Sequence, residues 1–142
     1  MKKIILIVAL LVMMVAVLSY ARQLDKVITI CENANIVASG NSTYTIDLAP
    51  YDVAGFFSIE TKIGSPGSGV TIDYGVSNKG TSFDYTGKTA IITDLLSTSG
   101  TRIVGFPTDE PIPCRYIQFR ATEALGTGVT GFYLYLLVVG DK

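Results

Sequence analysis

The sequence predicts an all-β protein, a two-sheet antiparallel β-sandwich of eight or nine strands with jelly-roll or Greek-key connectivity. Two observations predict this fold. Short apolar runs recur about every ten residues, separated by turns rich in Gly, Pro, Asn and Ser. Within most runs apolar and polar residues alternate, as they do in a strand that buries one face. The chain of 142 residues supports one domain, and it lacks the repeat of roughly 20–50 residues that a solenoid or propeller would show.

The stretch 55–77 shows the alternation most clearly. In its first run Phe57, Ile59 and Ile63 share one face, and in its second run Val70 and every second residue after it do the same. The connection GSPGSG between the runs cannot continue either strand. We therefore expect the two runs to form an antiparallel pair around which the other strands pack.

The remaining strands are expected before and after this pair. The first begins at Val27 and is followed either by a turn at 33–35 and a further short strand, or continues as one long bent strand. The glycine of the segment 78–80 can take the positive φ of a tight hairpin, with Phe83 and Tyr85 on the return strand. The other predicted strands span residues 44–48, 89–93, 101–106, 115–122 and 129–139.

The chain begins with the pattern of a secretory signal peptide, which would form an N-terminal hydrophobic helix. Lys2 and Lys3 precede an apolar run of 15 residues, and small residues follow at Ser19 and Ala21. We expect cleavage after Ala21, so that residues 1–21 are removed and residues 22–142 form the domain. The alternative is a short membrane anchor, although 15 residues span as a helix only about 22 Å of a hydrocarbon core of about 30 Å.

The predicted mature chain is weakly acidic. Of the eleven Lys and Arg residues, removal of Lys2 and Lys3 leaves nine against twelve Asp and Glu, a net charge of −3. The basic residues are scattered, so nucleic acid is not an expected partner. A membrane would be contacted only through residues 1–21, if these are retained, and the expected location is secreted or at the cell surface.

An oxidising compartment favours a disulfide between the two cysteines of the chain, Cys31 and Cys114. The bridge would join the first mature strand to the start of a late one. Closing so long a loop stabilises a fold by about 4–5 kcal/mol in the chain-entropy model. The alternative is two separately buried thiols, because cysteine is often buried without a bridge.

The last predicted strand, 129–139, is apolar on both faces, unlike a strand that buries one side only. Its second face could be covered by a loop or by the proline-rich crossover 107–114. It could also be a subunit interface, because exposed apolar patches mark contacts. The predicted self-association face comprises Tyr133, Tyr135, Leu137 and Val139.

The residues that most enzymes and metal sites need are missing. The chain has no histidine, which excludes Ser-His-Asp and Cys-His catalysis and histidine-based zinc sites. Glu60 and Asp73 could lie across from one another as a carboxylate pair, but two solvated carboxylates are favoured. Asp109 and Glu110 could hold calcium with backbone carbonyls, a weak pattern without a spaced acidic series. We expect no enzyme activity, no metal and no cofactor.

Carbohydrate binding is the main alternative function, because exposed aromatic side chains form platforms for sugars. The chain has no tryptophan, so tyrosines would have to serve, flanked by polar side chains. The candidate glycan contacts are Tyr51, Tyr85, Tyr116, Asp52, Arg115 and Gln118. For each tyrosine the alternative is a half-buried strand residue with its hydroxyl in water.

The succession FFSIETKI, GVTIDYGVSNKGTSF and PIPCRYIQFRAT resembles small β-sandwich modules of phage structural proteins and bacterial surface proteins. The hairpin and the strand RYIQFRAT carry the resemblance, which covers about residues 44–139. It implies a non-enzymatic domain that often associates with itself, while the export signal favours a surface or secreted protein. We therefore expect an exported structural or adhesive protein that forms a homo-oligomer or surface assembly, with a carbohydrate-binding module as the alternative.

Overall fold

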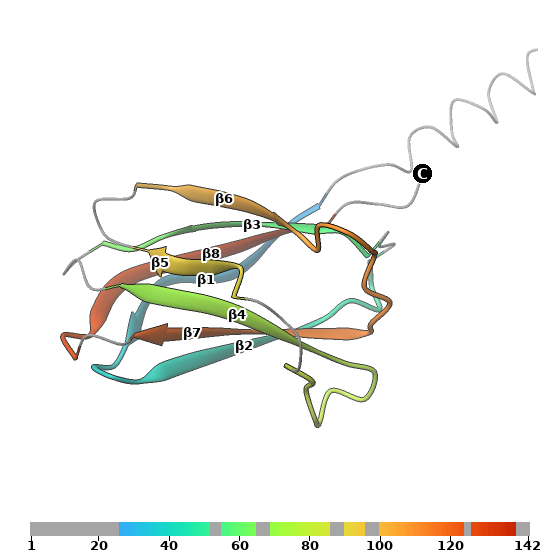
Figure 1. Ribbon diagram of the computed structural model, residues 1–142, viewed down its shortest axis with the longest axis horizontal. Coiled ribbons are helices and arrows are strands. Elements are labelled where there is room, and N and C mark those ends of the chain that lie inside the picture. Colours follow the sequence, from blue (N-terminus) through green and yellow to red (C-terminus); the bar gives the residue numbers. More distant parts are fainter. Residues whose placement is uncertain are drawn as a thin grey trace, which may run out of the picture.

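The computed structural model describes residues 26–51, 55–64, 69–85, 90–95, 100–123 and 126–138. These form eight β-strands, and no helix occurs among them (Figure 1). The strands are β1 (Lys26–Ile36), β2 (Asn41–Asp47), β3 (Phe57–Lys62), β4 (Val70–Ser77), β5 (Ile92–Leu95), β6 (Arg102–Phe106), β7 (Tyr116–Glu123) and β8 (Val129–Val138).

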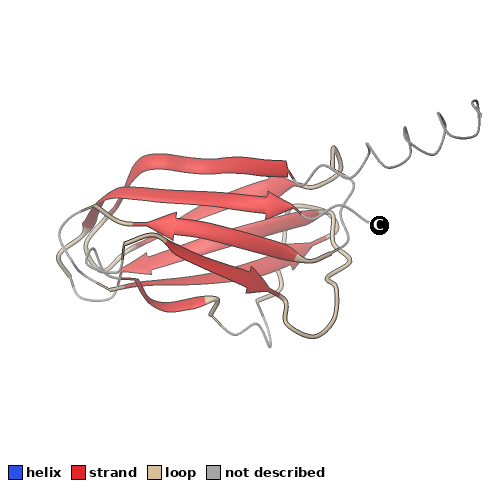
Figure 2. Cartoon of the chain, turned by 90° about the horizontal axis from the view of Figure 1, so that it is seen from above, coloured by secondary structure: helices blue, strands red, loops and turns tan. Residues whose placement is uncertain are grey.

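The strands form two antiparallel sheets of four, which confirms the predicted β-sandwich (Figures 1 and 2). One sheet has the order β1-β8-β3-β6 and the other β2-β7-β4-β5; we call them the first and the second sheet. The pairs β1–β8, β2–β7, β3–β6 and β4–β5 are nested, so the chain is a long hairpin rolled into two layers. This is the connectivity of a jelly roll.

The predicted pairing of the two runs in 55–77 is wrong. Both runs are strands, β3 and β4, but they lie in different sheets. β3 pairs with β8 and β6, whereas β4 pairs with β7 and β5. The two strands are therefore connected across the sandwich. Alternation determines which face of a strand is buried but not which strands lie beside it, so it is satisfied by either arrangement.

The first strand takes the long bent form of the two that the sequence allowed. β1 pairs with β8 from Lys26 to Ile36, with register shifts at three places. Asn33, expected in a turn, lies within the strand at a φ of 52°. Such irregularities bend a strand and increase its twist without ending it.

The predicted hairpin at 78–80 is present in reduced form. Gly80 has a φ of 74°, and the chain returns to form an isolated bridge between Val76 and Asp84. Phe83 and Tyr85 therefore do not lie on a full return strand. The strand expected at 89–93 lies slightly later, as β5.

The core lies between the sheets and is filled by alternate residues of the strands. In β7 the inward residues Ile117, Phe119 and Ala121 are fully buried, as predicted. The ring of Phe119 meets that of Phe106 edge to face at 5.9 Å between centroids. The other buried apolar residues are Ile36, Leu48, Phe57, Ile59, Ile63, Val70, Ile72, Tyr74, Ile92, Val129, Phe132, Leu134, Leu136 and Val138.

A buried carboxylate closes one end of the sandwich. Glu123, at the end of β7, is almost fully buried. Its Oε2 accepts hydrogen bonds from the backbone N–H of Ser39 at 2.6 Å and of Gly126 at 3.1 Å. One side chain therefore holds the turn before β2 and the turn before β8 together.

Within the part of the chain described, no helix is long and apolar enough to span a membrane. The predicted signal peptide or anchor, residues 1–21, lies outside the described residues.

Candidate binding surfaces

Four of the six predicted glycan contacts lie together on the outer face of the second sheet. Tyr116 and Gln118 point outward from β7, because the residues between them are buried. Tyr85 and Arg115 contact this face from the neighbouring loops. The alternation in the sequence predicted the faces of β7 correctly.

Tyr85 is held on this face by a short chain of hydrogen bonds. Its hydroxyl donates to Oε1 of Gln118 at 2.6 Å, and Nε2 of Gln118 donates to Oγ1 of Thr45 on β2 at 2.7 Å. The ring fits because the residue beneath it is Gly75, where a Cβ would lie only 2.8 Å from a ring carbon. Burial is the main cause that raises the pKa of the Tyr85 hydroxyl above its ordinary value.

An arginine that the sequence analysis did not single out completes the cluster. Nε of Arg120 donates to Oδ1 of Asp73 at 3.0 Å, and a second nitrogen donates to Oδ2. The Arg120 guanidinium carbon also lies 4.4 Å from the Tyr85 ring centroid. Its place could have been found from the alternation alone, because Arg120 follows Gln118 on the outward face of β7.

Arg115 and Tyr116 form the other end of this face. Arg115 donates two hydrogen bonds to Asp47, at 3.3 and 3.1 Å, and its guanidinium carbon lies 5.0 Å from the Tyr116 ring centroid. The hydrogen bonds from Arg115 lower the pKa of Asp47. Tyr85, Arg120, Tyr116 and Arg115 thus give the face two aromatic rings, each beside a guanidinium group.

Of the two remaining glycan candidates, Tyr51 does not join this surface. Tyr51 packs against the core, and Nζ of Lys26 lies 4.8 Å from its ring centroid. Asp52 lies outside the described residues. Glu60 and Asp73 do not form a carboxylate pair, because Glu60 points outward from the first sheet and Asp73 from the second, in line with the favoured expectation of two separate carboxylates.

The predicted self-association face lies on the outer side of the first sheet. Tyr133, Tyr135 and Leu137 alternate with the fully buried residues of β8 and are themselves half-buried. Val139 lies outside the described residues. By register Leu137 lies between Val27 of β1 and Ser58 of β3, and Val27 is 62% exposed.

Polar neighbours surround the two tyrosines of this face. The Tyr135 hydroxyl donates to Oε1 of Glu32 at 3.0 Å, and Nζ of Lys62 lies 5.1 Å from the Tyr133 ring centroid. A recess of about 200 Å³ opens beside them, lined by Glu60, Thr61, Lys62, Thr101, Tyr133 and Tyr135. The crossover that could have covered this face does not line the recess. It runs past Gly55, whose carbonyl oxygen accepts a hydrogen bond from the Ile112 N–H.

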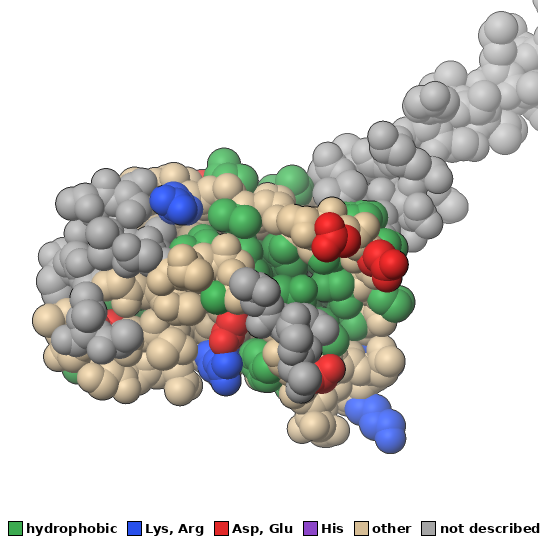
Figure 3. All heavy atoms as spheres, in the orientation of Figure 1, with side chains coloured by type: hydrophobic (Ala, Val, Ile, Leu, Met, Phe, Trp, Pro, Cys, Tyr) green, Lys and Arg blue, Asp and Glu red, His purple; other side chains and the backbone are tan. Residues whose placement is uncertain are grey.

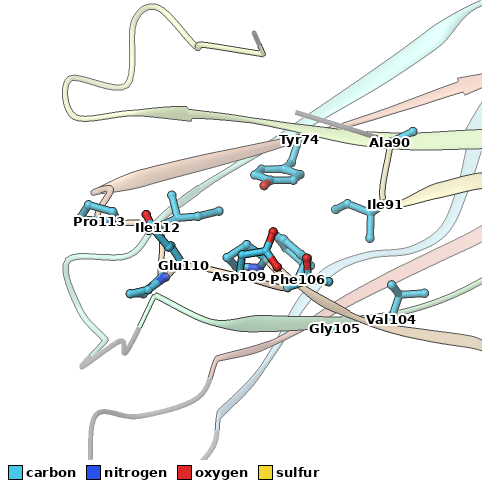
Figure 4. Close-up of a pocket in the computed structure, with 13 residues that line it drawn as sticks. Tyr74, Ala90, Ile91, Val104, Gly105, Phe106, Asp109, Glu110, Ile112 and Pro113 are labelled. Carbon is cyan, nitrogen blue, oxygen red and sulfur yellow. The ribbon is translucent and has the colours of Figure 1, made fainter. Parts of the chain in front are cut away.

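The crossover instead borders a cleft of about 940 Å³ where the edges of the two sheets meet (Figure 4). Phe106 and Val104 of β6 line one side, and Tyr74 and Ile91 line the other. Figure 3 shows apolar side chains along this side of the molecule, with acidic side chains toward one end. The residues lining the cleft are Tyr74, Ala90, Ile91, Val104, Gly105, Phe106 and the segment 107–113.

The cleft contains Asp109 and Glu110, the two acidic residues that the sequence offers as calcium ligands. Both are exposed and lie in the crossover. Among the residues described, no group of three or more His, Cys, Asp or Glu side chains lies close enough to hold a metal ion.

The predicted bridge between Cys31 and Cys114 is not formed in the structure, where both residues are thiols. Cys31 lies in β1 beside Tyr44, and burial is the main cause that raises the pKa of Tyr44 to about 12. Burial also raises the pKa of the Cys31 thiol. Cys114 instead lies near Tyr74 of β4. The two thiols thus lie near different tyrosines of the second sheet, Tyr44 on β2 and Tyr74 on β4.

Comparison with known proteins finds similarity at the level of fold. No protein-family model matches the sequence, and no curated protein sequence matches it. Among solved structures, the PBSX exported protein XepA superposes with a TM-score of 0.57 at 15% identity, over 82% of this chain and 38% of XepA. The VP2 subviral particle of infectious bursal disease virus gives a TM-score of 0.50 at 14% identity, over 84% of this chain and 33% of VP2.

A carbohydrate-binding module also matches. CBM32-1 from a family 31 glycoside hydrolase of Clostridium perfringens gives a TM-score of 0.45 at 16% identity, over 70% of this chain and 72% of the module. The chain spans little more than a third of XepA and a third of VP2. At these identities the likeness is one of fold, and it confirms the resemblance to small β-sandwich modules of the kind found in phage structural and bacterial surface proteins.

Proposed function

We propose that this is an exported, non-catalytic structural protein whose β-sandwich associates with copies of itself through the outer face of the first sheet. The observation that carries the proposal is the row of Tyr133, Tyr135 and Leu137 on that face. Two apolar side chains on the same face, Val27 and Ile103, are 62% and 69% exposed. Burying them against a second copy would release about 25 cal/mol for each Å² of apolar surface removed from water.

The composition of this face fits an interface. Tyrosines provide large contact area with a polar end, and they are enriched in protein interfaces. Glu60 and Lys62 border the row on β3 and provide a charged rim. The shared fold supports the proposal in two respects. The VP2 match comes from a viral particle, which favours assembly, and the XepA match is an exported protein, which favours export.

Sedimentation velocity of the exported protein over a range of concentrations tests the proposal. We expect a reversible oligomer that the variants Leu137→Glu and Val27→Glu dissociate. Thr43→Glu, which adds the same charge to an exposed position of the second sheet, is the control and should leave the oligomer unchanged. A monomer at the highest concentration reached would overturn the proposal.

Export is tested separately by the intact mass of the protein recovered outside the cytoplasm. We expect the mass of residues 22–142, as cleavage after Ala21 requires. A mass that includes residues 1–21 would favour the retained anchor.

A second candidate function is carbohydrate binding by the outer face of the second sheet. The observation in its favour is that Tyr85, Tyr116, Arg115 and Gln118, far apart in sequence, gather there with Arg120. A polysaccharide pull-down or glycan array tests it, with Tyr116→Ala as the variant and Tyr51→Ala, away from this face, as the control. Sugar binding by a protein that stays monomeric would reverse the order of the two proposals.

A further inference from the structure

One edge of the first sheet is formed by β6. Among the described strands β6 pairs with β3 alone. The Ser58 hydroxyl on β3 lies 3.4 Å from the Val104 carbonyl oxygen, so the backbone groups of Val104 face β3. Backbone groups alternate in direction along a strand, and those of Ile103 and Gly105 therefore face away from the sheet. They are donors and acceptors to which another strand can bind.

On this edge the exposed side chain of Ile103 projects outward, and Gly105 leaves a gap beside it. Ile103 and Gly105 both lie on the outer face, opposite Glu60 and Ser58. Ile103 is 69% exposed. A Cβ added to Gly105 would meet nothing closer than the Phe57 carbonyl oxygen at 3.8 Å, an ordinary contact. The packing of this subunit thus does not require glycine here, and a glycine inside a strand often marks the close approach of another backbone.

Charges of opposite sign lie at the two ends of the same edge. Arg102 is exposed at the start of β6, and Asp109 and Glu110 are exposed in the segment after its end. Along the upper part of Figure 3 a basic side chain lies toward the left and acidic side chains toward the right. An antiparallel second copy would bring each basic end to an acidic end.

We propose that two copies of the chain pair β6 with β6, antiparallel, about a twofold axis at Val104. The inference rests on the proposed self-association and adds a sheet edge to the outer face. In this register Ile103 of each copy lies opposite Gly105 of the other, and both residues have their backbone groups directed across the edge. Ile103 of one copy fills the space above Gly105 of the other. Arg102 of one copy then lies toward Asp109 and Glu110 of the other. The two first sheets become one sheet of eight strands with a single continuous outer face.

The other edges are less suited to such pairing. β1 is bent by register shifts, and β5 has only four residues. β2 is a regular edge strand, but its outward positions hold Thr43 and Thr45, which offer no apolar projection. At β6, exposed backbone groups, the fit of Ile103 to Gly105 and the opposite charges are each self-complementary about a twofold axis, as a symmetric interface requires.

Two kinds of variant test the pairing by sedimentation velocity of the exported protein. Gly105→Thr places a side chain where Ile103 of the second copy would lie, and Arg102→Glu sets like charges against Asp109 and Glu110. Each is expected to raise the dimer dissociation constant at least about tenfold. The triple change Arg102→Glu, Asp109→Lys and Glu110→Lys should restore association. Lys79→Glu, an exposed position in the turn after β4, repeats the charge change of Arg102→Glu and should have no effect.

The outcomes separate this inference from the proposed function. Loss of association in both β6 variants with recovery in the triple variant supports the edge pairing, even if Leu137→Glu has no effect. If Leu137→Glu dissociates the protein while the β6 variants do not, the edge pairing is overturned and the proposed face stands. A wild-type monomer overturns both. Far-UV circular dichroism shows whether each variant is folded. If Gly105→Thr does not fold, the surface substitution Arg102→Glu tests the edge pairing without it.

Discussion

The hydroxyl of Tyr85 donates a hydrogen bond of 2.6 Å to Oε1 of Gln118, which joins the loop after β4 to the middle of β7. The ring lies directly over Gly75, and Gln118 continues the contact to Thr45 on β2. Three segments of the second sheet are therefore tied together by one tyrosine, and the tie depends on the absence of a side chain at position 75.

Gly75→Ala should destabilise the protein by about 1–3 kcal/mol, because the added methyl displaces the Tyr85 ring and the hydrogen bond to Gln118 is lost. Urea unfolding followed by circular dichroism measures the change. Lys79→Ala, at an exposed turn position away from this contact, is the control, and it should change stability by less than about 0.5 kcal/mol. Equal effects of the two alanines would show that the ring does not depend on Gly75.

Glu123→Ala should cost about 2–4 kcal/mol, because it removes the buried acceptor of the Ser39 and Gly126 N–H groups. Chemical denaturation again gives the free energy of unfolding. Lys79→Ala, at an exposed turn position, should lie within about 0.5 kcal/mol of the wild type. A wild-type stability for Glu123→Ala would mean that these backbone groups find other acceptors.

The pairing of Asp47 with Arg115 should make stability depend on acid. The folded-state pKa of Asp47 lies below its ordinary value of 3.8, so its contribution is present above that value and is lost as pH falls through the lower folded value. Melting temperatures between about pH 5 and pH 2 should fall less steeply in Asp47→Asn than in the wild type. The difference will be small, because the pair is exposed.

The two cysteines should both titrate as thiols when the protein is unfolded without a reducing agent. In the folded protein the Cys31 thiol should react slowly at neutral pH, because burial raises its pKa and little thiolate is present. A thiol reagent measures the number of thiols in the unfolded protein and their reaction rates in the folded protein. Cys31→Ser identifies which rate belongs to Cys31. Finding no thiol in the unfolded protein would restore the bridge between Cys31 and Cys114.

Much of the fold could be predicted from the sequence, because the period of two in runs such as Tyr116–Glu123 reports which side chains face the core. The partners of the strands could not be predicted in this way. The loop GSPGSG permits both a return within one sheet and a crossing to the other, and the choice depends on how all eight strands share one core. β3 and β4 therefore have the predicted faces but not the predicted pairing.

The second-sheet surface was predicted in part for the same reason. Tyr116 and Gln118 share a face by alternation, but Tyr85 joins them only because the chain after β4 folds back to the bridge between Val76 and Asp84. Tyr51 could not be separated from these residues by sequence, since its packing against the core depends on contacts across the sandwich.

The pairing of β1 with β8 places Lys26 opposite Val138, so the first strand finds its main partner in the last. Contacts so distant along the chain form slowly, because closing a large loop lowers the conformational entropy of the chain before the contacts can stabilise the fold. If the chain crosses a membrane amino end first, β1 emerges before its partner β8. The sandwich can then close only after β8 has also crossed. In the proposed export, the domain would therefore complete its folding after translocation.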